Sequence, residues 1–144
     1  MTVAQILSRK GTAVVTASAT DSVGDICRSL AENRVGAIVV TEGNGAIAGI
    51  VSERDIVRQM AAEGAAAMDR PVSDIMTRGV VTCTPSDSVL TLMTLMTERR
   101  IRHVPVVVNG RLRGIVSIGD VVKRRIEDAE REAEEMKRYI AEGT

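Results

Sequence analysis

One stretch of this chain occurs twice, and this repetition constrains the fold more than any other feature. Residues 49–58 return as residues 114–123, and 6 of 10 positions are identical. Upstream of each copy, residues 14–41 match residues 80–107 at 9 of 28 positions after a shift of 66. Self-similarity at a fixed period indicates a duplicated supersecondary unit. We therefore expect two copies of one unit that share a buried surface.

Each copy has the pattern β-α-β-β-α, preceded by a turn of helix at 3–7 or 72–76. The first copy predicts these elements: strands at 13–16, 37–41 and 46–52, and helices from Thr20/Asp21 to about 33 and from 53 to about 62. The second copy predicts these elements: strands at 80–82, 103–108 and 111–117, and a helix from about Asp87 to Arg99. Asn109-Gly110 is a strong signal for the second hairpin.

These elements predict an α/β (α+β) fold in which two β-α-β-β-α repeats pack as a pseudo-twofold pair. The predicted divisions are a first domain, a linker, a second domain and a C-terminal helical extension at 3–62, 63–71, 72–124 and 125–144. The last helix is expected from Gly119 to about Ala141, or roughly 33 Å at 1.5 Å per residue.

Beyond Lys123 this helix has an apolar seam with spacings of three and four residues, typical of two heptads. The seam consists of Ile126, Ala129, Ala133, Met136 and Ile140. It can dock on its own domain or pair with a second chain, and the sequence leaves both alternatives open.

Composition excludes several classes of protein. The net charge is zero, so the chain lacks the excess of positive charge that binds nucleic-acid phosphates. It also has no Phe or Trp on which bases could stack. No apolar run is long enough to span a membrane, and residues 1–11 lack the apolar stretch of a signal peptide. Cys27 and Cys83 are isolated, which favours two reduced thiols in the cytoplasm. We expect neither a nucleic-acid nor a membrane partner.

The repeated stretch joins a short strand to a helix through Ser52-x-x-Asp55 in one copy and Ser117-x-x-Asp120 in the other. The simplest interpretation is a capping box, with Asp in the place of the usual Glu or Gln. Alternatively, the serine and the helix N-terminus hold a phosphate, while the aspartate accepts hydrogen bonds from ribose hydroxyls. The two roles can coexist.

Two β-α-β-β-α units, each with Gly-hydrophobic-hydrophobic-Ser-x-x-Asp, resemble a tandem pair of cystathionine-β-synthase (CBS) domains. Residues 102–107, Arg-His-Val-Pro-Val-Val, add to the resemblance, which covers about residues 3–124. It implies a non-catalytic module that binds adenosine-containing ligands in clefts between paired sheets. It also implies a homodimer shaped like a flat disc.

The resemblance places ligand-binding residues in two clefts. One cleft would use Ser52, Arg54, Asp55, Val80, Val81, Ile101, Arg102 and His103. The other would use Ser117, Asp120, Val14, Val15 and Val35. At the second cleft Ile118-Gly119 replaces Glu53-Arg54, and Gly36-Ala37 replaces Arg102-His103, so weaker phosphate binding is expected there.

These features predict a sensor that binds an adenine nucleotide such as AMP, ADP, ATP or NADH as a regulatory ligand and controls an unidentified partner protein. No cofactor, metal site or catalytic residue is expected, because the chain has one histidine and no Walker, Gly-x-Ser-x-Gly or HExxH motif. The main alternative is a structural or interaction protein with vestigial clefts and a partner-docking C-terminal helix. A weaker one is an enzyme that acts on a bound nucleotide.

Overall fold

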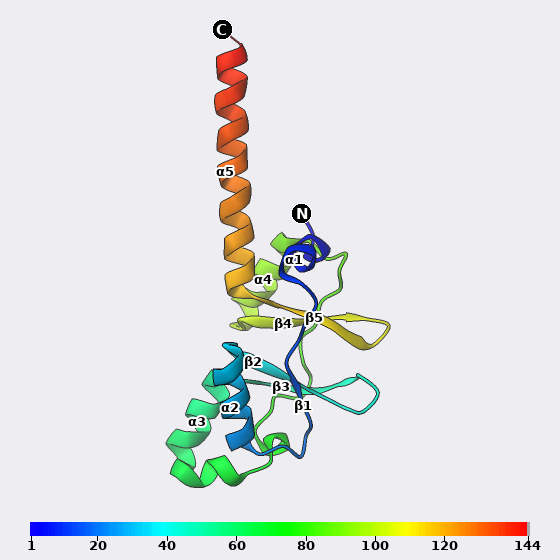
Figure 1. Ribbon diagram of the computed structural model, residues 1–144, viewed down its shortest axis with the longest axis vertical. Coiled ribbons are helices and arrows are strands. Elements are labelled where there is room, and N and C mark those ends of the chain that lie inside the picture. Colours follow the sequence, from blue (N-terminus) through cyan, green and yellow to red (C-terminus); the bar gives the residue numbers. More distant parts are fainter. Residues whose placement is uncertain (144) are drawn as a thin grey trace.

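A computed structural model describes residues 1–143 and confirms two halves that share the order helix, strand, strand, helix, the last helix being the long C-terminal one (Figure 1). The first half contains α1 (Val3–Lys10), β1 (Thr16–Ala17), α2 (Val23–Asn33), β2 (Ala37–Thr41), β3 (Ile47–Ser52) and α3 (Glu53–Glu63). The second half contains α4 (Val89–Arg99), β4 (His103–Val108), β5 (Arg111–Ser117) and α5 (Ile118–Glu142). The 3₁₀ helices η1 (Gly64–Asp69) and η2 (Val72–Asp74) lie between the halves.

The strands form two small sheets that lie one above the other in Figure 1. In the first sheet β1 pairs parallel with β2, and β2 pairs antiparallel with β3. In the second sheet β4 pairs antiparallel with β5. Both hairpins change register at matching places, Val40/Thr41 and Val106/Val107, so even this irregularity is repeated.

The predicted strand at 80–82 is wrong. In the described chain this segment has no strand pairing, and the ladder is reduced to one parallel bridge between Cys83 and Val106. Cys83 makes both bonds, since its N–H donates to Pro105 O at 3.0 Å and its carbonyl accepts from Val107 N–H at 2.9 Å. Pro85, two residues later, has no N–H to donate to a ladder. The matching strand, predicted at 13–16, likewise begins three residues later, because β1 covers only Thr16–Ala17.

Serines rather than the predicted residues cap α2 and α4. Ser22 Oγ accepts from Asp25 N–H at 3.1 Å, and Ser88 Oγ accepts from Thr91 N–H at 3.0 Å. Asp21 instead holds the preceding turn, because its carboxylate accepts from Ser18 N–H at 2.9 Å. A serine at the N-cap satisfies one of the free helix amides.

Each hydrophobic core takes its first segment from the other half of the sequence. The core of the second half, formed mainly by α4, β4 and β5, includes Val3 and Leu7 of α1. The core of the first half, formed mainly by α2, β2 and β3, includes Val72 of η2 and Met76, which follows η2. The halves are therefore interleaved, because each core contains a segment from the other half.

The glycine that opens each repeated stretch is needed for close packing of these exchanged segments. A Cβ atom on Gly49 would lie 2.7 Å from Met76 Sδ, and one on Gly114 would lie 2.9 Å from Leu7 Cδ2. Contacts this short exclude any side chain unless the neighbour moves. The same residue type thus serves the same contact in both halves.

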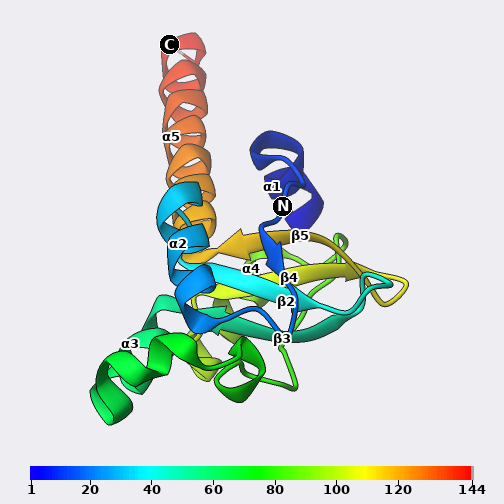
Figure 2. The same cartoon turned by 60° about the horizontal axis from the view of Figure 1, so that its bottom comes forward.

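Helix α5 extends well beyond the rest of the molecule (Figures 1 and 2). Its first turns pack on the second half, where Val121 and Asp128 are buried. Beyond them the predicted seam does not dock on its own domain, because Ile126, Met136 and Ile140 are 54%, 60% and 59% exposed. No helix within residues 1–143 is both long and apolar enough to cross a membrane.

Candidate functional site

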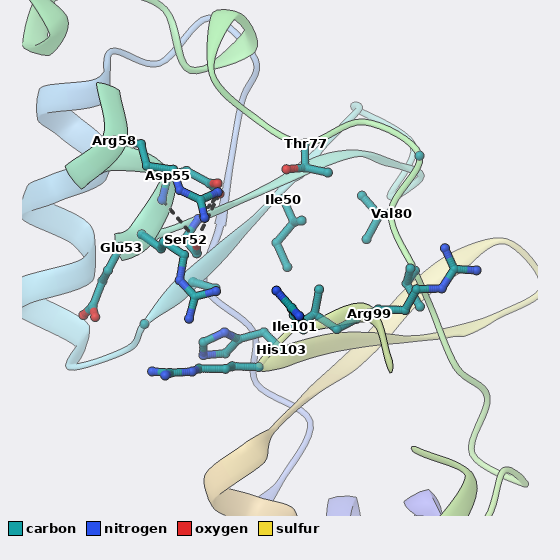
Figure 3. A pocket seen from close by; sticks show the side chains of 17 residues that line it. Ile50, Ser52, Glu53, Asp55, Arg58, Thr77, Val80, Arg99, Ile101 and His103 are labelled. Carbon is teal, nitrogen blue, oxygen red and sulfur yellow. Dashed lines mark hydrogen bonds between the residues drawn. The ribbon is translucent and has the colours of Figure 1, made fainter. Parts of the chain in front are cut away.

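A pocket of about 530 Å³ lies between the two halves at the start of α3, and we call it the Asp55 pocket (Figure 3). Its wall includes all the residues predicted for the first cleft: Ser52, Arg54, Asp55, Val80, Val81, Ile101, Arg102 and His103. In Figure 3, Ile101 and His103 lie across the pocket from Ser52 and Asp55. Residues far apart in the sequence therefore converge on one cavity.

Ser52 and Asp55 form the capping box at the start of α3, yet they leave hydrogen-bonding capacity. Asp55 Oδ2 accepts from Ser52 N–H at 2.9 Å and from Ser52 Oγ at 3.0 Å. Ser52 Oγ in turn accepts from Asp55 N–H at 3.3 Å. Within residues 1–143, Asp55 Oδ1 has no hydrogen-bond partner. Capping fixes the carboxylate in place, and its second oxygen can accept from a ligand hydroxyl.

The N-terminus of α3 also offers a backbone donor. Glu53 N–H donates to Gly36 O at 3.0 Å, and Asp55 N–H is used by the cap. Among the first three amides of α3, Arg54 N–H thus remains without a protein acceptor in the described chain. A free amide at a helix N-terminus, next to an arginine side chain, is suited to an anion such as phosphate.

Apolar side chains form the opposite part of the wall. Ile50 of β3 bonds the backbone of Thr77 in both directions, at 3.0 and 2.8 Å, which holds the segment after η2 along the sheet. This pairing brings Val80 and Val81 into the pocket beside Ile101. Branched aliphatic side chains can pack on both faces of a flat ring such as a purine.

His103, the first residue of β4, lies against the first half of the chain. A Cβ atom on Gly36 would be 3.1 Å from His103 Nε2, so only glycine fits this position without movement. Burial and the Lys10 ammonium lower the pKa of His103, although the carboxylates of Glu53 and Asp120 oppose the shift. The imidazole is therefore held neutral between the two repeated corners.

Sequence reasoning missed several wall residues, three of them arginines. Arg58 lies one turn after Arg54 on α3, and Arg99 and Arg100 end α4 just before Arg102. The spacing of four residues on a helix and the dense run of arginines at 99–102 were signals for them. Thr77 and Gly79 also line the pocket, and no local sequence signal pointed to either residue.

The second corner, at the start of α5, has the same capping box but a different neighbour. Asp120 Oδ2 accepts from Ser117 N–H at 2.8 Å and from Lys10 Nζ at 2.5 Å. Burial raises the pKa of the Asp120 carboxyl, but its bonds with Lys10 and Ser117 outweigh burial and hold it below its usual value. Lys10 thus binds the capping oxygen of Asp120, and Asp120 Oδ1 has no hydrogen-bond partner within residues 1–143.

The hollow beside Asp120 is not lined by Val14, Val15 or Val35 of the predicted second cleft. Asp120 faces a hollow of about 100 Å³ with charged neighbours from α1 and α5, including Arg9, Lys123 and Glu127. Val15 and Val35 pack against the core of the first half, and Val14 is half-buried outside both hollows. The hollow beside Asp120 is therefore much smaller than the Asp55 pocket, and charged side chains line it.

The Asp55 pocket is equipped for binding. Within residues 1–143, no group of three or more His, Cys, Asp and Glu side chains is arranged to hold a metal ion. Its wall combines a carboxylate oxygen, a helix N-terminus, guanidinium groups and an aliphatic surface. Together these groups can contact a sugar diol, an anion and a flat ring.

Comparison with known proteins identifies the family. The sequence pattern described as "CBS domain" matches residues 3–62 and 72–127. The "CBS domain-containing protein CBSX3, mitochondrial" of Arabidopsis thaliana is 39% identical over 127 residues, which are 85% of this chain and 62% of that protein. The chain thus spans less than two thirds of that relative's length.

Solved structures agree with this assignment. The CBS-domain containing protein ATU1752 from Agrobacterium tumefaciens is 47% identical with a TM-score of 0.84, over 86% of this chain and 92% of that one. The CBS domain protein PAE2072 from Pyrobaculum aerophilum, complexed with AMP, is 32% identical with a TM-score of 0.75, over 83% and 89%. CBS domains are generally regulatory and non-catalytic. The chain belongs to the CBS domain family and carries two CBS domains in tandem.

Proposed function

We propose that this chain is a non-catalytic sensor that binds an adenine nucleotide in the Asp55 pocket and thereby regulates a partner protein. The nucleotide acts as a regulatory ligand rather than as a cofactor. The aliphatic wall holds the adenine, Asp55 accepts from the ribose hydroxyls, and Arg54, Arg102 and the α3 N-terminus bind phosphate.

The observation that carries this proposal is the convergence of these groups on one pocket of nucleotide size, about 530 Å³. The complex of the Pyrobaculum aerophilum relative with AMP supports the ligand class. The free oxygen of Asp55 supports the ribose contact, because the capping box uses only Oδ2.

Isothermal titration calorimetry with AMP, ADP, ATP, NADH, S-adenosylmethionine and adenosine tests the proposal. At least one phosphorylated adenosine should bind, and at 100 times its dissociation constant it should add about 2.7 kcal/mol to the free energy of unfolding. Turnover assays on the ligands that bind should show no product. The absence of binding by every adenosine compound would contradict the proposal, and turnover would favour an enzyme.

The proposed compartment is the cytoplasm. Cys27 and Cys83 are both free thiols, and burial raises the pKa of Cys83 to about 12. A thiol with so high a pKa is almost entirely protonated at neutral pH and reacts slowly with oxidants. Reduced, unreactive cysteines suit a reducing compartment.

We also propose a homodimer, because the seam of α5 remains exposed. Ile126, Met136 and Ile140 are more than half exposed, and a second copy would bury them. Sedimentation equilibrium should give about twice the mass of 15.4 kDa, and a chain that ends after Arg125 should dimerise more weakly. A monomer at micromolar concentration would count against the dimer. It would leave the seam available to another protein, as the alternative of an interaction protein requires.

A further inference from the structure

Arginine side chains gather around the Asp55 pocket more densely than one phosphate requires. Three separate segments supply them, namely α3, the end of α4 and the residues just before β4. We call these residues the arginine cluster: Arg54, Arg58, Arg99, Arg100 and Arg102. Glu53 and Asp55 are the acidic residues of the same wall, so the wall has three more positive than negative charges. The whole chain, in contrast, has a net charge of zero.

None of these guanidinium groups has a hydrogen-bond or ion-pair partner within residues 1–143. Elsewhere arginines do pair, as Arg70 does with Glu63 at 3.0 Å and Arg131 with Asp128 at 3.0 Å. Five like charges around one cavity repel one another, and the two carboxylates of the wall, Glu53 and Asp55, offset only part of that repulsion. A multiply charged anion would offset it.

Backbone requirements do not explain the arginine at the end of α4. Arg100 has a φ of 55°, a left-handed conformation that glycine or asparagine adopts more easily. Arg34 occupies the same place in the first half with a φ of 54°, but it does not line the Asp55 pocket. The repeat therefore explains why Arg34 and Arg100 share a left-handed backbone conformation. Of these two residues, Arg100 alone lines the Asp55 pocket.

We propose that the Asp55 pocket selects adenosine compounds with a chain of two or three phosphates over AMP and adenosine. Arg54, Arg102 and the free amide of α3 are sufficient for the first phosphate. Arg58, Arg99 and Arg100 then bind the second and third phosphates. S-Adenosylmethionine is disfavoured, since its sulfonium would lie among like charges. This inference rests on the proposed nucleotide site and names the ligand class that the site prefers.

Titration of the full chain with ATP, ADP, AMP and adenosine, in a buffer without divalent cations, tests the selection. Each added phosphate should tighten binding about tenfold, in line with one additional charge-assisted contact. ATP affinity should fall steeply with added NaCl, and adenosine affinity should change little. Equal affinities for AMP and ATP would overturn the inference and leave the proposed function intact.

The double variant Arg99→Ala/Arg100→Ala tests which residues carry the selection. It should weaken ATP at least about tenfold and AMP less than about threefold. Arg34→Ala is the matched control, because it removes an arginine from the same left-handed position outside the pocket, and it should leave ATP affinity unchanged. If the double variant weakened ATP binding and AMP binding equally, Arg99 and Arg100 would not be the residues that contact the second and third phosphates.

Inorganic tripolyphosphate separates the failure of this inference from failure of the proposed function. If tripolyphosphate binds and the double variant abolishes its binding, the cluster is a polyphosphate site even where no adenine compound binds. In that case the proposed adenine-nucleotide function and the selection among adenosine compounds are both wrong, and only phosphate binding by the arginine cluster stands. If neither ATP nor tripolyphosphate binds, the inference is overturned.

Discussion

The two repeated corners of this molecule share one backbone but differ in what reaches the aspartate. At the Asp55 corner the carboxylate caps α3 and keeps one oxygen free beside a pocket of about 530 Å³. At the Asp120 corner the equivalent carboxylate caps α5 and also binds Lys10, beside a hollow of about 100 Å³. The Ser-x-x-Asp motif therefore specifies a helix start, while the neighbouring segment decides whether a ligand can enter.

The neighbouring segments come from the exchanged parts of the fold. Helix α1 packs on the second half and delivers Lys10 to Asp120. The segment after η2 packs on the first half, and it delivers Gly79, which has no side chain, to the Asp55 pocket. Internal duplication thus produced two similar corners with different neighbours, Lys10 at Asp120 and Gly79 at the Asp55 pocket.

The largest expected effect separates the two aspartates. Asp55→Ala should weaken ATP or AMP binding about ten- to a hundredfold, because it removes a charge-assisted contact with ribose of about 1.5–3 kcal/mol. Asp120→Ala is the matched control and should leave this affinity unchanged. Both variants lose a capping box, so each should lose about 1 kcal/mol of stability.

Calorimetry for affinity and urea denaturation for stability measure the two effects separately. Unaltered affinity in Asp55→Ala, with the expected loss of stability, would reduce Asp55 to a helix cap. The comparison between the corners would then have no functional meaning.

A second prediction concerns Lys10 and would make the closed corner resemble the open one. Lys10→Met should release Asp120 and allow adenosine to bind there, so the stoichiometry should rise from one to two ligands per chain. The Lys10–Asp120 pair is partly exposed, with side chains 29% and 24% accessible, so its loss should cost no more than about 1 kcal/mol.

Arg9→Met on the same helix is the control, because Arg9 pairs with Glu127 and not with Asp120. Its stoichiometry should remain one. A stoichiometry of one in Lys10→Met as well would mean that residues other than Lys10 close the Asp120 corner.

Much of the fold could be predicted from the sequence, because the repeat provides two independent views of each element. Strands β2, β4 and β5 have the predicted bounds, since short runs rich in Val and Ile and the Asn109-Gly110 turn are local signals. The strand at 80–82 could not be judged in this way, because strand pairing depends on partners that are distant in sequence. Its apolar residues line a pocket instead of a sheet.

The candidate site, like the fold, was predictable where local motifs define it and unpredictable where contacts join distant parts of the chain. Residues of the Asp55 pocket could be placed from the family resemblance, because each lies next to a recognisable motif. Lys10 could not be linked to Asp120, since their contact joins residues 110 positions apart and depends on α1 crossing to the second half. Val14, Val15 and Val35 were grouped with Asp120 by the family resemblance, and that grouping stays a prediction.

The smallest expected effect concerns His103, which lies between the two corners and responds to both. Burial lowers the pKa of His103, and the positive charges of Lys10 and Arg102 lower it further. The carboxylates of Glu53 and Asp120 raise this pKa, but they do not outweigh the other effects. In the unfolded chain the imidazole should titrate near its ordinary value of about 6.5. The unfolded state therefore binds the proton at a higher pH than the folded state does, so the stability from the neutral imidazole is complete above about pH 6.5.

This stability should be lost as the pH falls from about 6.5 through the lower pKa of the folded state. His103→Gln should remove the pH dependence of the urea midpoint in that range, and the result has one assignment because the chain contains a single histidine. The same histidine gives one C2 proton signal for titration by NMR. Its pKa should be higher in Lys10→Met than in the original chain, because the variant removes a nearby positive charge and leaves Asp120 unpaired. An identical pKa in both proteins would show that His103 does not sense the Asp120 corner, and the two corners would then be electrostatically independent.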